Sequence, residues 1–442
     1  MKVAQKETAI LVGLERPDFR EADESSLEEL ALLAQTAGIA VAAVLSQRRA
    51  APDPAFYIGE GKARELAATA RDYEAGLAIF NDELSASQVR NLERLTGLKI
   101  MDRTTLILDI FASRARSREG KLQVELARLQ YSLLHLIGAG QQLSRLGGGI
   151  GTRGPGETQL ESDRRVIRRR IGELKNEIKA IRRHRSLHRQ RRQRNKIPLI
   201  SLVGYTNAGK STLLNALTGA ELYTADQLFA TLDPTVRRAV LPGGRAVLLA
   251  DTVGFIEKLP KTLETAFRAT LEEINAADLL LHVVDLSRPH CLRQMDAVRE
   301  QLQRIEPHYY LRELVAFNKI DCCNDSNFLN ALQRQHPGAL FISARSGAGL
   351  ETLRNAIASR LEEGLERIKV YLPYSQTALI EQMQRFGKVL RVDYQPAYQA
   401  VDALVEPAMA ARLIPYLEKP ESGEQSDLEN KNLERERDCD YA

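Results

Sequence analysis

Residues 204–211 have the composition and spacing of a phosphate-binding loop. They match G-x-x-x-x-G-K-[ST] and comprise Gly204, Tyr205, Thr206, Asn207, Ala208, Gly209, Lys210 and Ser211. A strand-like apolar run at 197–203 precedes the loop, and a helical pattern through Leu213, Leu214 and Leu217 follows it. Thr212, directly after the loop, is counted among the predicted nucleotide-binding residues. Backbone N–H groups and the helix N-terminus of such a loop hold phosphates. We expect Lys210 to neutralise the β- and γ-phosphate oxygens and the Ser211 hydroxyl to bind Mg²⁺.

A second motif follows the strand-like run Val247–Ala250 and comprises Asp251, Thr252, Val253 and Gly254. An aspartate at this strand end can hold Mg²⁺ directly or through water, and the Gly254 amide can contact the γ-phosphate. The pattern D-x-x-G is common by itself. Because it stands after a strand and downstream of the phosphate loop, we predict that both motifs belong to one nucleotide site.

Two further motifs predict the base that is bound. One comprises Asn318, Lys319, Ile320 and Asp321, and the other comprises Ser343, Ala344 and Arg345. The Asp321 carboxylate can accept hydrogen bonds from N1–H and the exocyclic amine of guanine, whereas adenine would leave that charge unpaired. Asn318 can join the base edge to the phosphate loop, the Lys319 stem can cover the ring, and the Ala344 N–H can donate to guanine O6. These residues predict GTP and GDP as ligands, although Arg345 stands where a lysine is usual.

The segment between the phosphate loop and Asp251 contains a candidate switch, formed by Phe229, Ala230, Thr231, Leu232 and Asp233. A threonine here can close on Mg²⁺ and the γ-phosphate in the GTP state and leave after hydrolysis. We favour Thr231 for this role, as a second metal ligand beside Ser211; Thr235 is the alternative. With Lys210, Asp251 and Gly254, Thr231 completes the predicted catalytic set.

The residue after Gly254 is Phe255, where many GTPases have the glutamine that orients the attacking water. Free hydrolysis should therefore be slow, and another loop, a cation or a bound partner should supply the missing element. Asn207 could bind K⁺ for this purpose. An asparagine that bonds to its own loop backbone is an equally good interpretation.

The length of 442 residues indicates several domains around these motifs. Cys291, Cys322, Cys323 and Cys439 lack the spacing of a disulfide framework or a zinc site, so we expect reduced thiols and a cytoplasmic protein. The apolar runs are too short to span a membrane. Residues 1–112 alternate strand-like runs (Ala9–Val12, Ile39–Leu45, Leu77–Phe80) with helical segments (Ser26–Ala37, Gly61–Ala75), which predicts an N-terminal α/β domain with a parallel sheet.

Residues 113–196 predict a long antiparallel helical hairpin. Two apolar stripes share spacings of four and three residues: Leu122, Leu126, Leu129, Leu133 and Leu136, then Ile167, Ile171, Leu174, Ile178 and Ile181. We expect helices of about 20–30 residues, which would project roughly 30–45 Å, joined by a glycine-rich tip at 138–160. Between Glu161 and Lys196 the chain has 15 lysines and arginines against four acids, and the basic residues up to Arg183 avoid the stripe.

The remaining boundaries follow from the motifs and the composition. Residues 197–365 predict a P-loop GTPase domain of α/β class. Residues 366–418 predict a small C-terminal α/β domain with strands at Ile368–Leu372, Val389–Val392 and Ala400–Val405. Residues 419–442 are polar and acidic, which predicts a disordered tail.

The segment 147–161 (GGGIGTRGPGETQLE), with Gly204–Ser211 and Phe229–Thr235, resembles the HflX family of ribosome-associated GTPases over nearly the whole chain. The resemblance implies binding to the large ribosomal subunit, with the hairpin tip reaching its peptidyl-transferase region. It also implies that stalled or idle ribosomes are split into subunits, notably under stress, with hydrolysis stimulated by the ribosome. The basic hairpin independently suits ribosomal RNA, with Arg145 and Arg153 on phosphates. We expect a monomer.

Two other hypotheses remain open. The chain could be a ribosome-assembly or RNA-modification GTPase that times its release from precursor RNA with the same switch. It could also be a scaffold that binds RNA through the hairpin and uses GTP only for stability. A solvated basic face is the ordinary explanation for a charge run, and it competes with RNA binding for the hairpin.

Overall fold

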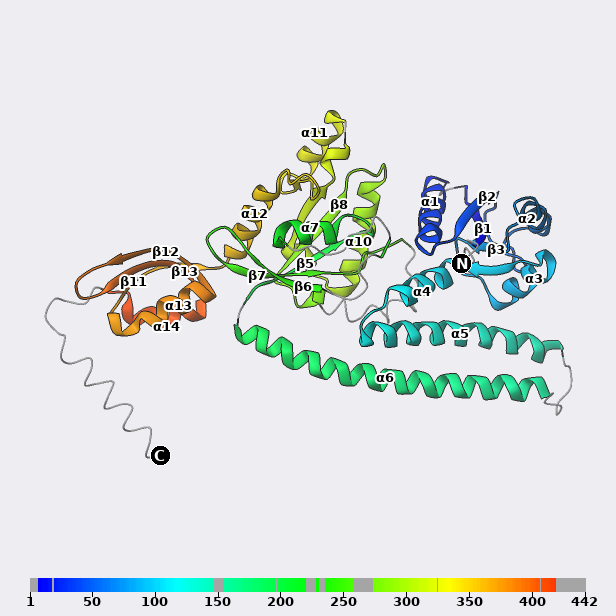
Figure 1. Cartoon of the computed structure of the whole chain (residues 1–442), viewed down its shortest axis with the longest axis horizontal. Coiled ribbons are helices and arrows are strands. Elements are labelled where there is room, and N and C mark those ends of the chain that lie inside the picture. The colour runs from blue at the N-terminus through cyan, green and yellow to red at the C-terminus, as the bar shows by residue number, and fades with distance from the viewer. Residues whose placement is uncertain are drawn as a thin grey trace, which may run out of the picture. The chain divides into compact units, whose positions relative to one another are not determined.

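The computed structural model describes residues 7–17, 20–146, 155–195, 197–219, 228–229, 235–257, 273–323, 325–405 and 407–418. By its contacts the chain divides into two compact units. The larger unit holds residues 1–190, 199–237 and 249–350, and the smaller unit holds residues 191–198, 238–248 and 351–442. Figure 1 labels helices and strands of both where there is room. Among the described residues, no helix combines the length and apolar composition that a membrane crossing requires.

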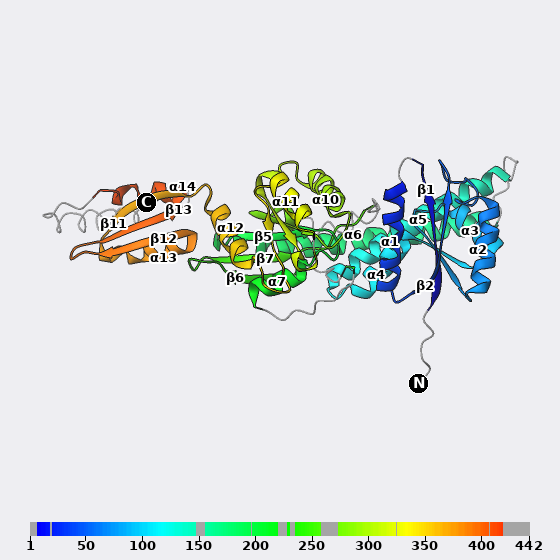
Figure 2. The ribbon, with the colours of Figure 1, turned by 90° about the horizontal axis from the view of Figure 1, so that it is seen from above.

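The first domain is a parallel sheet with helices on both faces, as the sequence predicts (Figures 1 and 2). Its elements are β1 (Thr8–Glu15), α1 (Arg20–Thr36), β2 (Ala40–Arg48), α2 (Glu60–Asp72), β3 (Leu77–Phe80), α3 (Ala86–Thr96), β4 (Lys99–Asp102) and α4 (Arg103–Arg114), with strand order β2-β1-β3-β4. Alternate residues of β1 serve the two faces, because side chains alternate along a strand. Ala9 and Leu11 join the core under α1 and α4, whereas Ile10 and Val12 join the core under α2 and α3.

Two helix ends show why local sequence places α3 and α4 where they are. Ser85 begins α3 with a capping box, in which its hydroxyl accepts from the Gln88 N–H and the Gln88 side chain accepts from the Ser85 N–H. Asp102 caps α4 by accepting from the Thr105 N–H at 2.9 Å. The predicted helix at Ser26–Ala37 was too short at its start, since α1 begins at Arg20.

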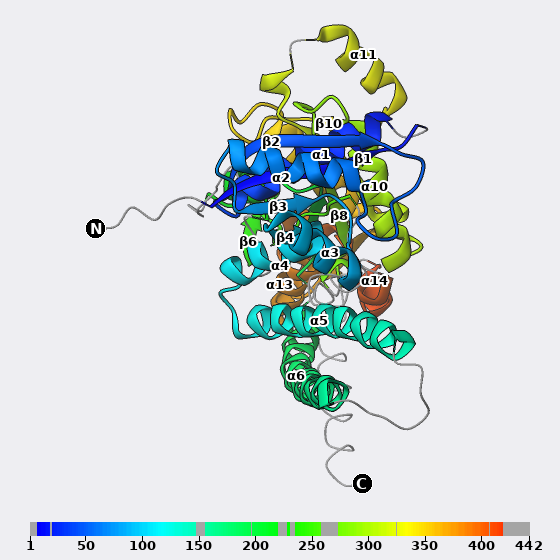
Figure 3. The ribbon, with the colours of Figure 1, turned by 90° about the vertical axis from the view of Figure 1, so that its right-hand side faces the viewer.

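The hairpin consists of α5 (Arg118–Leu146) and α6 (Pro155–Asn195). Nine of its ten predicted stripe residues form one apolar cluster: Leu122, Leu126, Leu129, Leu133, Ile167, Ile171, Leu174, Ile178 and Ile181. The helix of 41 residues at α6 exceeds the predicted 20–30. The tip predicted at 138–160 was also too long, because α5 continues through Gly138 and Gly140. Figure 3 shows α5 between the first domain and α6, and α5 contacts α3 and α4.

A six-stranded sheet of order β10-β9-β8-β5-β7-β6 carries the predicted nucleotide motifs. Its elements are β5 (Leu199–Gly204), α7 (Lys210–Thr218), β6 (Thr235–Val240), β7 (Ala246–Asp251), β8 (Leu279–Asp285), α10 (Cys291–Ile305), β9 (Glu313–Asn318), α11 (Ser326–Gln335), β10 (Leu340–Phe341) and α12 (Leu350–Glu362). β5, β8, β9 and β10 pair in parallel. Ligands of such sheets bind beyond the carboxyl ends of the strands, and β5, β7 and β9 each end in a predicted motif.

The chain ends in a small antiparallel sheet of order β11-β13-β12. It is built from β11 (Glu366–Leu372), α13 (Thr377–Phe386), β12 (Gly387–Tyr394), β13 (Gln399–Val405) and α14 (Pro407–Leu413). The three predicted strands are each present, and Val370, Val401 and Met383 lie in the core between sheet and helices. The tail predicted at 419–442 lies outside the described residues.

Candidate nucleotide-binding site

The phosphate loop runs from the end of β5 at Gly204 to the start of α7 at Lys210, and two glycines are required by its shape. Gly209 has φ of +91°, and a Cβ there would lie 2.3 Å from Asn318 Nδ2. Gly204 has φ of +151°, and a Cβ there would lie 2.2 Å from the Val283 carbonyl oxygen. Both distances exclude any side chain, so the loop can take this course only with glycine at each position.

Lys210 is buried at the start of α7, with only 6% of its surface exposed. Its ammonium group donates to the carbonyl oxygens of Gly204 at 3.1 Å and of Tyr205 at 2.8 Å. Burial lowers the lysine pKa to about 8, and the Asp251 carboxylate partly opposes this shift. The charge is therefore held inside the loop, where a phosphate could replace the two carbonyl oxygens as its partner.

Ser211 and Asp251 meet beside the loop, although 40 residues separate them. The Ser211 hydroxyl donates to Asp251 Oδ2 at 2.6 Å. Two oxygen atoms of this kind fit a hard cation such as Mg²⁺, which prefers hydroxyl, carboxylate, water and phosphate oxygens. The other predicted metal ligand, Thr231, lies outside the described residues together with Ala230, Leu232 and Asp233.

Asn318 connects three of the predicted motifs. Its Nδ2 donates to the Ala208 carbonyl oxygen at 2.9 Å, and its Oδ1 accepts from the Ala344 N–H at 2.9 Å. Asn318 is buried, so each of these bonds satisfies a group that would otherwise be costly to bury. The phosphate loop and both base-selecting motifs therefore meet at one side chain.

Asp321, the carboxylate predicted to select guanine, is exposed, and its pKa is lowered. A hydrogen bond from the Ser343 side chain holds the pKa of Asp321 below its usual range. Lys319, at φ of +65°, extends its ammonium to Asp285 Oδ2 at 2.7 Å. Asp321 is thus available as a charged acceptor beside the base-edge residue Asn318.

Three side chains of the predicted site point into protein and not toward a ligand. The Phe229 ring packs edge-on against Phe111 of α4, with centroids 4.6 Å apart, and Val253 joins the same core. The Thr252 hydroxyl donates to the Leu202 carbonyl oxygen at 2.6 Å. Only the main chain of these residues can therefore contact a nucleotide in this arrangement.

The segment after Gly254 lies against the phosphate loop. The Thr206 N–H donates to the Phe255 carbonyl oxygen at 2.8 Å, and the Phe255 N–H donates to the Gly204 carbonyl oxygen at 3.1 Å. The Phe255 ring is buried in a core with Val203 and Ile274. The apolar ring is therefore packed inside the protein and cannot orient a water molecule by hydrogen bonding.

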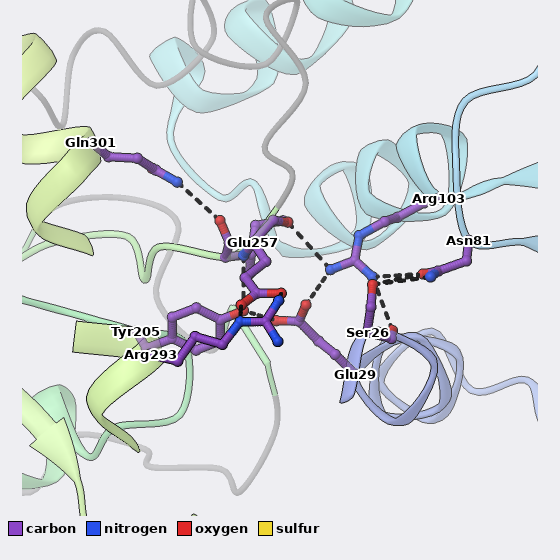
Figure 4. A network of polar contacts seen from close by, with 9 residues as sticks. Ser26, Glu29, Asn81, Arg103, Tyr205, Glu257, Arg293 and Gln301 are labelled. Atoms are coloured by element: carbon purple, nitrogen blue, oxygen red, sulfur yellow. Dashed lines mark hydrogen bonds and ion pairs between the residues drawn. The ribbon is translucent and has the colours of Figure 1, made fainter. Parts of the chain in front are cut away.

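Three polar residues that the sequence analysis missed, Glu29, Arg103 and Glu257, join the first domain to Tyr205 of this site (Figure 4). The Tyr205 hydroxyl donates to Glu29 Oε1 at 2.6 Å and accepts from the Glu257 N–H at 2.8 Å. Arg103 forms an ion pair with Glu29 and donates to the Glu257 carbonyl oxygen at 3.4 Å. The only sequence signal for this contact was Tyr205, a large side chain in a loop of mostly small residues. Glu29, Arg103 and Glu257 belong to no motif.

Three family descriptions match consecutive parts of the chain. "GTP-binding GTPase N-terminal" matches residues 24–112, "GTP-binding GTPase Middle Region" matches residues 114–192, and "50S ribosome-binding GTPase" matches residues 199–319. The first two cover the first domain and the hairpin, and the third covers the sheet that carries the phosphate loop.

Curated relatives resemble the chain over most of its length, and those described here are named GTPase HflX. The protein from Caldanaerobacter subterraneus is 48% identical over 92% of this chain and 93% of its own length. The one from Alkalihalophilus pseudofirmus is 53% identical over 71% of this chain and 74% of its own length. The one from Escherichia coli is 44% identical over 80% of this chain and 83% of its own length.

Proposed function

Because the chain belongs to the HflX family of GTPases and hydrolyses GTP, we propose that it binds the large ribosomal subunit and splits stalled or idle ribosomes. We place this activity in the cytoplasm, under stress, and expect the ribosome to stimulate hydrolysis. The match of residues 199–319 to a family described as ribosome-binding supports the partner. The observation that carries the proposal is the basic hairpin attached to the GTPase domain.

The charge of the hairpin lies on the face that its own packing leaves open. Ile171, Leu174 and Ile178 of α6 are buried against α5. The exposed basic residues of the same helix are Arg165, Arg168, Arg169, Lys175, Lys179 and Arg183. Lysines and arginines in such a row neutralise phosphates along an RNA backbone. A long, stiff and basic arm suits a surface made largely of ribosomal RNA.

The proposed nucleotide site would supply the parts that phosphoryl transfer needs. We assign Lys210 to the β- and γ-phosphates, the Gly254 amide to the γ-phosphate, and Asp321 to guanine. Mg²⁺ would be held by Ser211 and Thr231, with Asp251 beside them, and would neutralise charge that develops on the phosphate oxygens. The buried Lys210 and the hydroxyl–carboxylate pair of Ser211 and Asp251 support these roles.

A sedimentation experiment tests the proposed function. Intact ribosomes are mixed with the protein and GTP, GDP or a non-hydrolysable GTP analogue, and subunits are separated on a sucrose gradient. We expect dissociation with GTP and with the analogue, little with GDP, and none with Lys210→Ala. Intact ribosomes that stay whole with GTP would contradict the proposal, and binding confined to immature particles would favour an assembly factor.

Charge removal on the hairpin tests its role in ribosome binding. We expect Arg165→Gln, Arg168→Gln and Arg169→Gln together to weaken ribosome binding and to reduce its salt dependence by about one unit of slope for each RNA phosphate that is no longer neutralised. The matched control removes three exposed arginines of the first domain, Arg64, Arg71 and Arg90. Equal effects of both triple variants would show that total charge, and not the hairpin, determines binding.

A potassium ion at Asn207 would supply positive charge in place of an arginine finger, in a site where Phe255 replaces the water-orienting glutamine. Asn207 has φ of +62° inside the phosphate loop. We expect GTP hydrolysis to be faster in K⁺ than in Na⁺, and Asn207→Ala to abolish the difference. Equal rates of the unmodified protein in both salts would exclude this role for Asn207.

A further inference from the structure

The phosphate loop passes directly beside Phe255, the residue that stands in place of the water-orienting glutamine. Tyr205 and Phe255 form a parallel β-bridge, and the Thr206 N–H donates to the Phe255 carbonyl oxygen at 2.8 Å. The Phe255 ring itself is buried in an apolar core. Thr206, whose side chain can form hydrogen bonds, is therefore bound to the main chain of the residue that cannot orient water.

The Thr206 side chain lies on the same side of Gly254 as the Lys210 ammonium group. A Cβ built on Gly254 would be 2.8 Å from Thr206 Cγ2 and 3.0 Å from Lys210 Nζ, so the two side chains approach one point. In the assignment proposed above, the Lys210 ammonium and the Gly254 amide bind the γ-phosphate. Thr206 is thus a neighbour of both groups that would hold the phosphorus atom under attack.

The Thr206 hydroxyl is buried and has no hydrogen-bond partner within the part of the chain that the structure describes. The residue as a whole is 6% exposed. A buried hydroxyl without a partner costs free energy, because it has given up its bonds to water without gaining others. Such groups are few in native proteins and call for an explanation, of which a catalytic role is one. We therefore expect a ligand to complete the bonding of this hydroxyl.

Two polar side chains of the neighbouring segment are, by contrast, bound to protein. The Thr252 hydroxyl donates to the Leu202 carbonyl oxygen at 2.6 Å. The Glu257 carboxylate pairs with Arg293 at 2.9 Å. Neither side chain can turn to an attacking water without losing its present partner, whereas the Thr206 hydroxyl has no such bond to lose.

We infer that Thr206 is a catalytic residue whose hydroxyl orients the attacking water beside the γ-phosphate, in the role that glutamine has in many other GTPases. A hydroxyl has one donor and two acceptor positions, so it can accept a bond from the water and donate to a γ-phosphate oxygen at once. The inference rests on the proposed nucleotide site and does not depend on the proposed ribosomal partner.

The hydroxyl acts by orientation and is unchanged by the reaction. The water oxygen forms a bond to the γ-phosphorus, and the bond from that phosphorus to the β–γ bridging oxygen breaks. One proton of the water stays on the released phosphate, and the other passes to solvent. Placing the water in line with the breaking bond lowers the barrier without any proton transfer to Thr206.

Single-turnover hydrolysis by the full chain, at saturating GTP and without ribosomes, tests the inference. Thr206→Val removes the hydroxyl and keeps a branched side chain, whereas Thr206→Ser keeps the hydroxyl. We expect Thr206→Val to slow hydrolysis roughly 10-fold to 100-fold in K⁺ and in Na⁺ alike, which separates this effect from that of Asn207. Thr206→Ser should stay within about threefold of the unmodified protein, and GDP affinity should change less than about twofold in both variants.

Thr218→Val is the matched control, because the Thr218 hydroxyl at the far end of α7 donates to the Leu214 carbonyl oxygen at 2.8 Å. We expect its rate to stay within about twofold of the unmodified protein. The inference is overturned if Thr206→Val hydrolyses GTP as fast as Thr218→Val, or if Thr206→Ser is as slow as Thr206→Val.

Two further measurements separate catalysis from binding and from stability. The affinity of a non-hydrolysable GTP analogue should fall by less than the rate does in Thr206→Val, and an equal fall would reduce the hydroxyl to a phosphate-binding group and overturn the inference. Thermal unfolding of Thr206→Val should show no loss of stability, because the lost hydroxyl has no partner. A lower Tm with an unaltered rate would indicate a structural role and would also overturn it.

Discussion

The phosphate loop and the contact with the first domain lie side by side, but they are built in different ways. The loop is eight consecutive residues whose backbone geometry does the binding, with Gly204 and Gly209 at positions that admit no side chain. The contact combines Glu29, Arg103, Tyr205 and Glu257, which are far apart in the sequence. Nucleotide binding therefore depends on residues that are consecutive in the sequence, whereas the contact with the first domain depends on residues that only the fold brings together.

The two regions also differ in what a substitution should do. Changes at loop residues other than Tyr205 and Thr206 remove space or donors that every guanine nucleotide needs, so they should weaken GTP and GDP binding alike. Changes in the contact should alter the ratio of the GTP affinity to the GDP affinity and leave the GDP affinity nearly unchanged, because the contact holds the segment of Gly254, whose amide we assign to the γ-phosphate. Each variant can therefore be assigned to one region by measuring both affinities.

The largest effect should come from Gly209→Ala. The new methyl group would meet Asn318 Nδ2 at 2.3 Å at a φ of +91°, so the loop cannot keep its course. We expect GTP and GDP binding to fall roughly 100-fold or more, from a strain of about 3 kcal/mol. Gly219→Ala is the control, because its φ of +68° carries the same backbone strain with nothing within 4 Å. Similar losses in both variants would mean that backbone strain, and not the collision, is responsible.

Asn318→Ala should have the next largest effect. It leaves the Ala208 carbonyl oxygen and the Ala344 N–H without their shared partner. We expect both nucleotides to bind roughly 10-fold to 100-fold more weakly, as measured by fluorescence titration. Asn91→Ala removes a comparable bond to the Ala55 carbonyl oxygen in the first domain and should leave both affinities unchanged. An unaltered affinity in Asn318→Ala would show that the motifs are held together without it.

The pH dependence of binding should follow Lys210. Its pKa of about 8 in the nucleotide-free protein means that the ammonium is present below pH 8 and is lost above it. Phosphates require that charge, so GTP and GDP affinities should be nearly flat up to about pH 7, fall about twofold by pH 8 and about tenfold by pH 9. Calorimetry at pH 8.5 in buffers of different ionisation enthalpy should detect proton uptake on binding. The absence of uptake would place the pKa of Lys210 elsewhere.

The same shift has an opposite consequence for stability. The unfolded chain keeps its lysine proton up to about pH 10.4, while native Lys210 releases its proton near pH 8. The Lys210 contribution therefore makes unfolding of the nucleotide-free protein less favourable as pH rises through this window. Affinity and intrinsic stability should thus move in opposite directions above pH 8.

The smallest effect should come from Arg293→Ala, within the contact itself. Arg293 pairs with the Glu257 carboxylate at 2.9 Å, but its side chain is 40% exposed. Solvent-exposed ion pairs contribute about 0–1 kcal/mol, so the ratio of GTP-analogue to GDP affinity should change less than about twofold. A larger shift would mean that the Glu257 side chain, and not its main chain, joins the contact to the nucleotide site.

The sequence predicted those parts of the molecule whose geometry is set by a few neighbouring residues. The phosphate loop between β5 and α7, the proximity of the motifs that contain Ser211 and Asp251, and the apolar stripe of the hairpin were all expected from spacing. Each depends on local backbone form or on helical periodicity, which the chain carries in its own order.

Other features depend on partners that no spacing reveals. The side chains of Phe229 and Val253 pack into a core that includes Phe111 of the first domain. The motifs alone predicted that these residues contact the nucleotide, because the sequence gives no sign of this core. The extension of α5 through Gly138 and Gly140 shows that a helix can outlast two glycines, each of which costs only about 1 kcal/mol. Glu29 and Arg103 had no sequence signal, because an ion pair between α1 and α4 is a product of the sheet that aligns them.

Every other assignment depends on Asp321 and Lys210 binding the same nucleotide. Comparing nucleotides that differ only in their base tests this most directly. Xanthine has a carbonyl where guanine has its exocyclic amine, so an amide in place of the carboxylate should reverse the preference. By calorimetry, we expect the unmodified protein to bind GTP and to reject ATP and xanthosine triphosphate, and Asp321→Asn to bind xanthosine triphosphate in preference to GTP. An Asp321→Asn variant that still prefers GTP, or an unmodified protein that binds ATP equally well, would contradict the account.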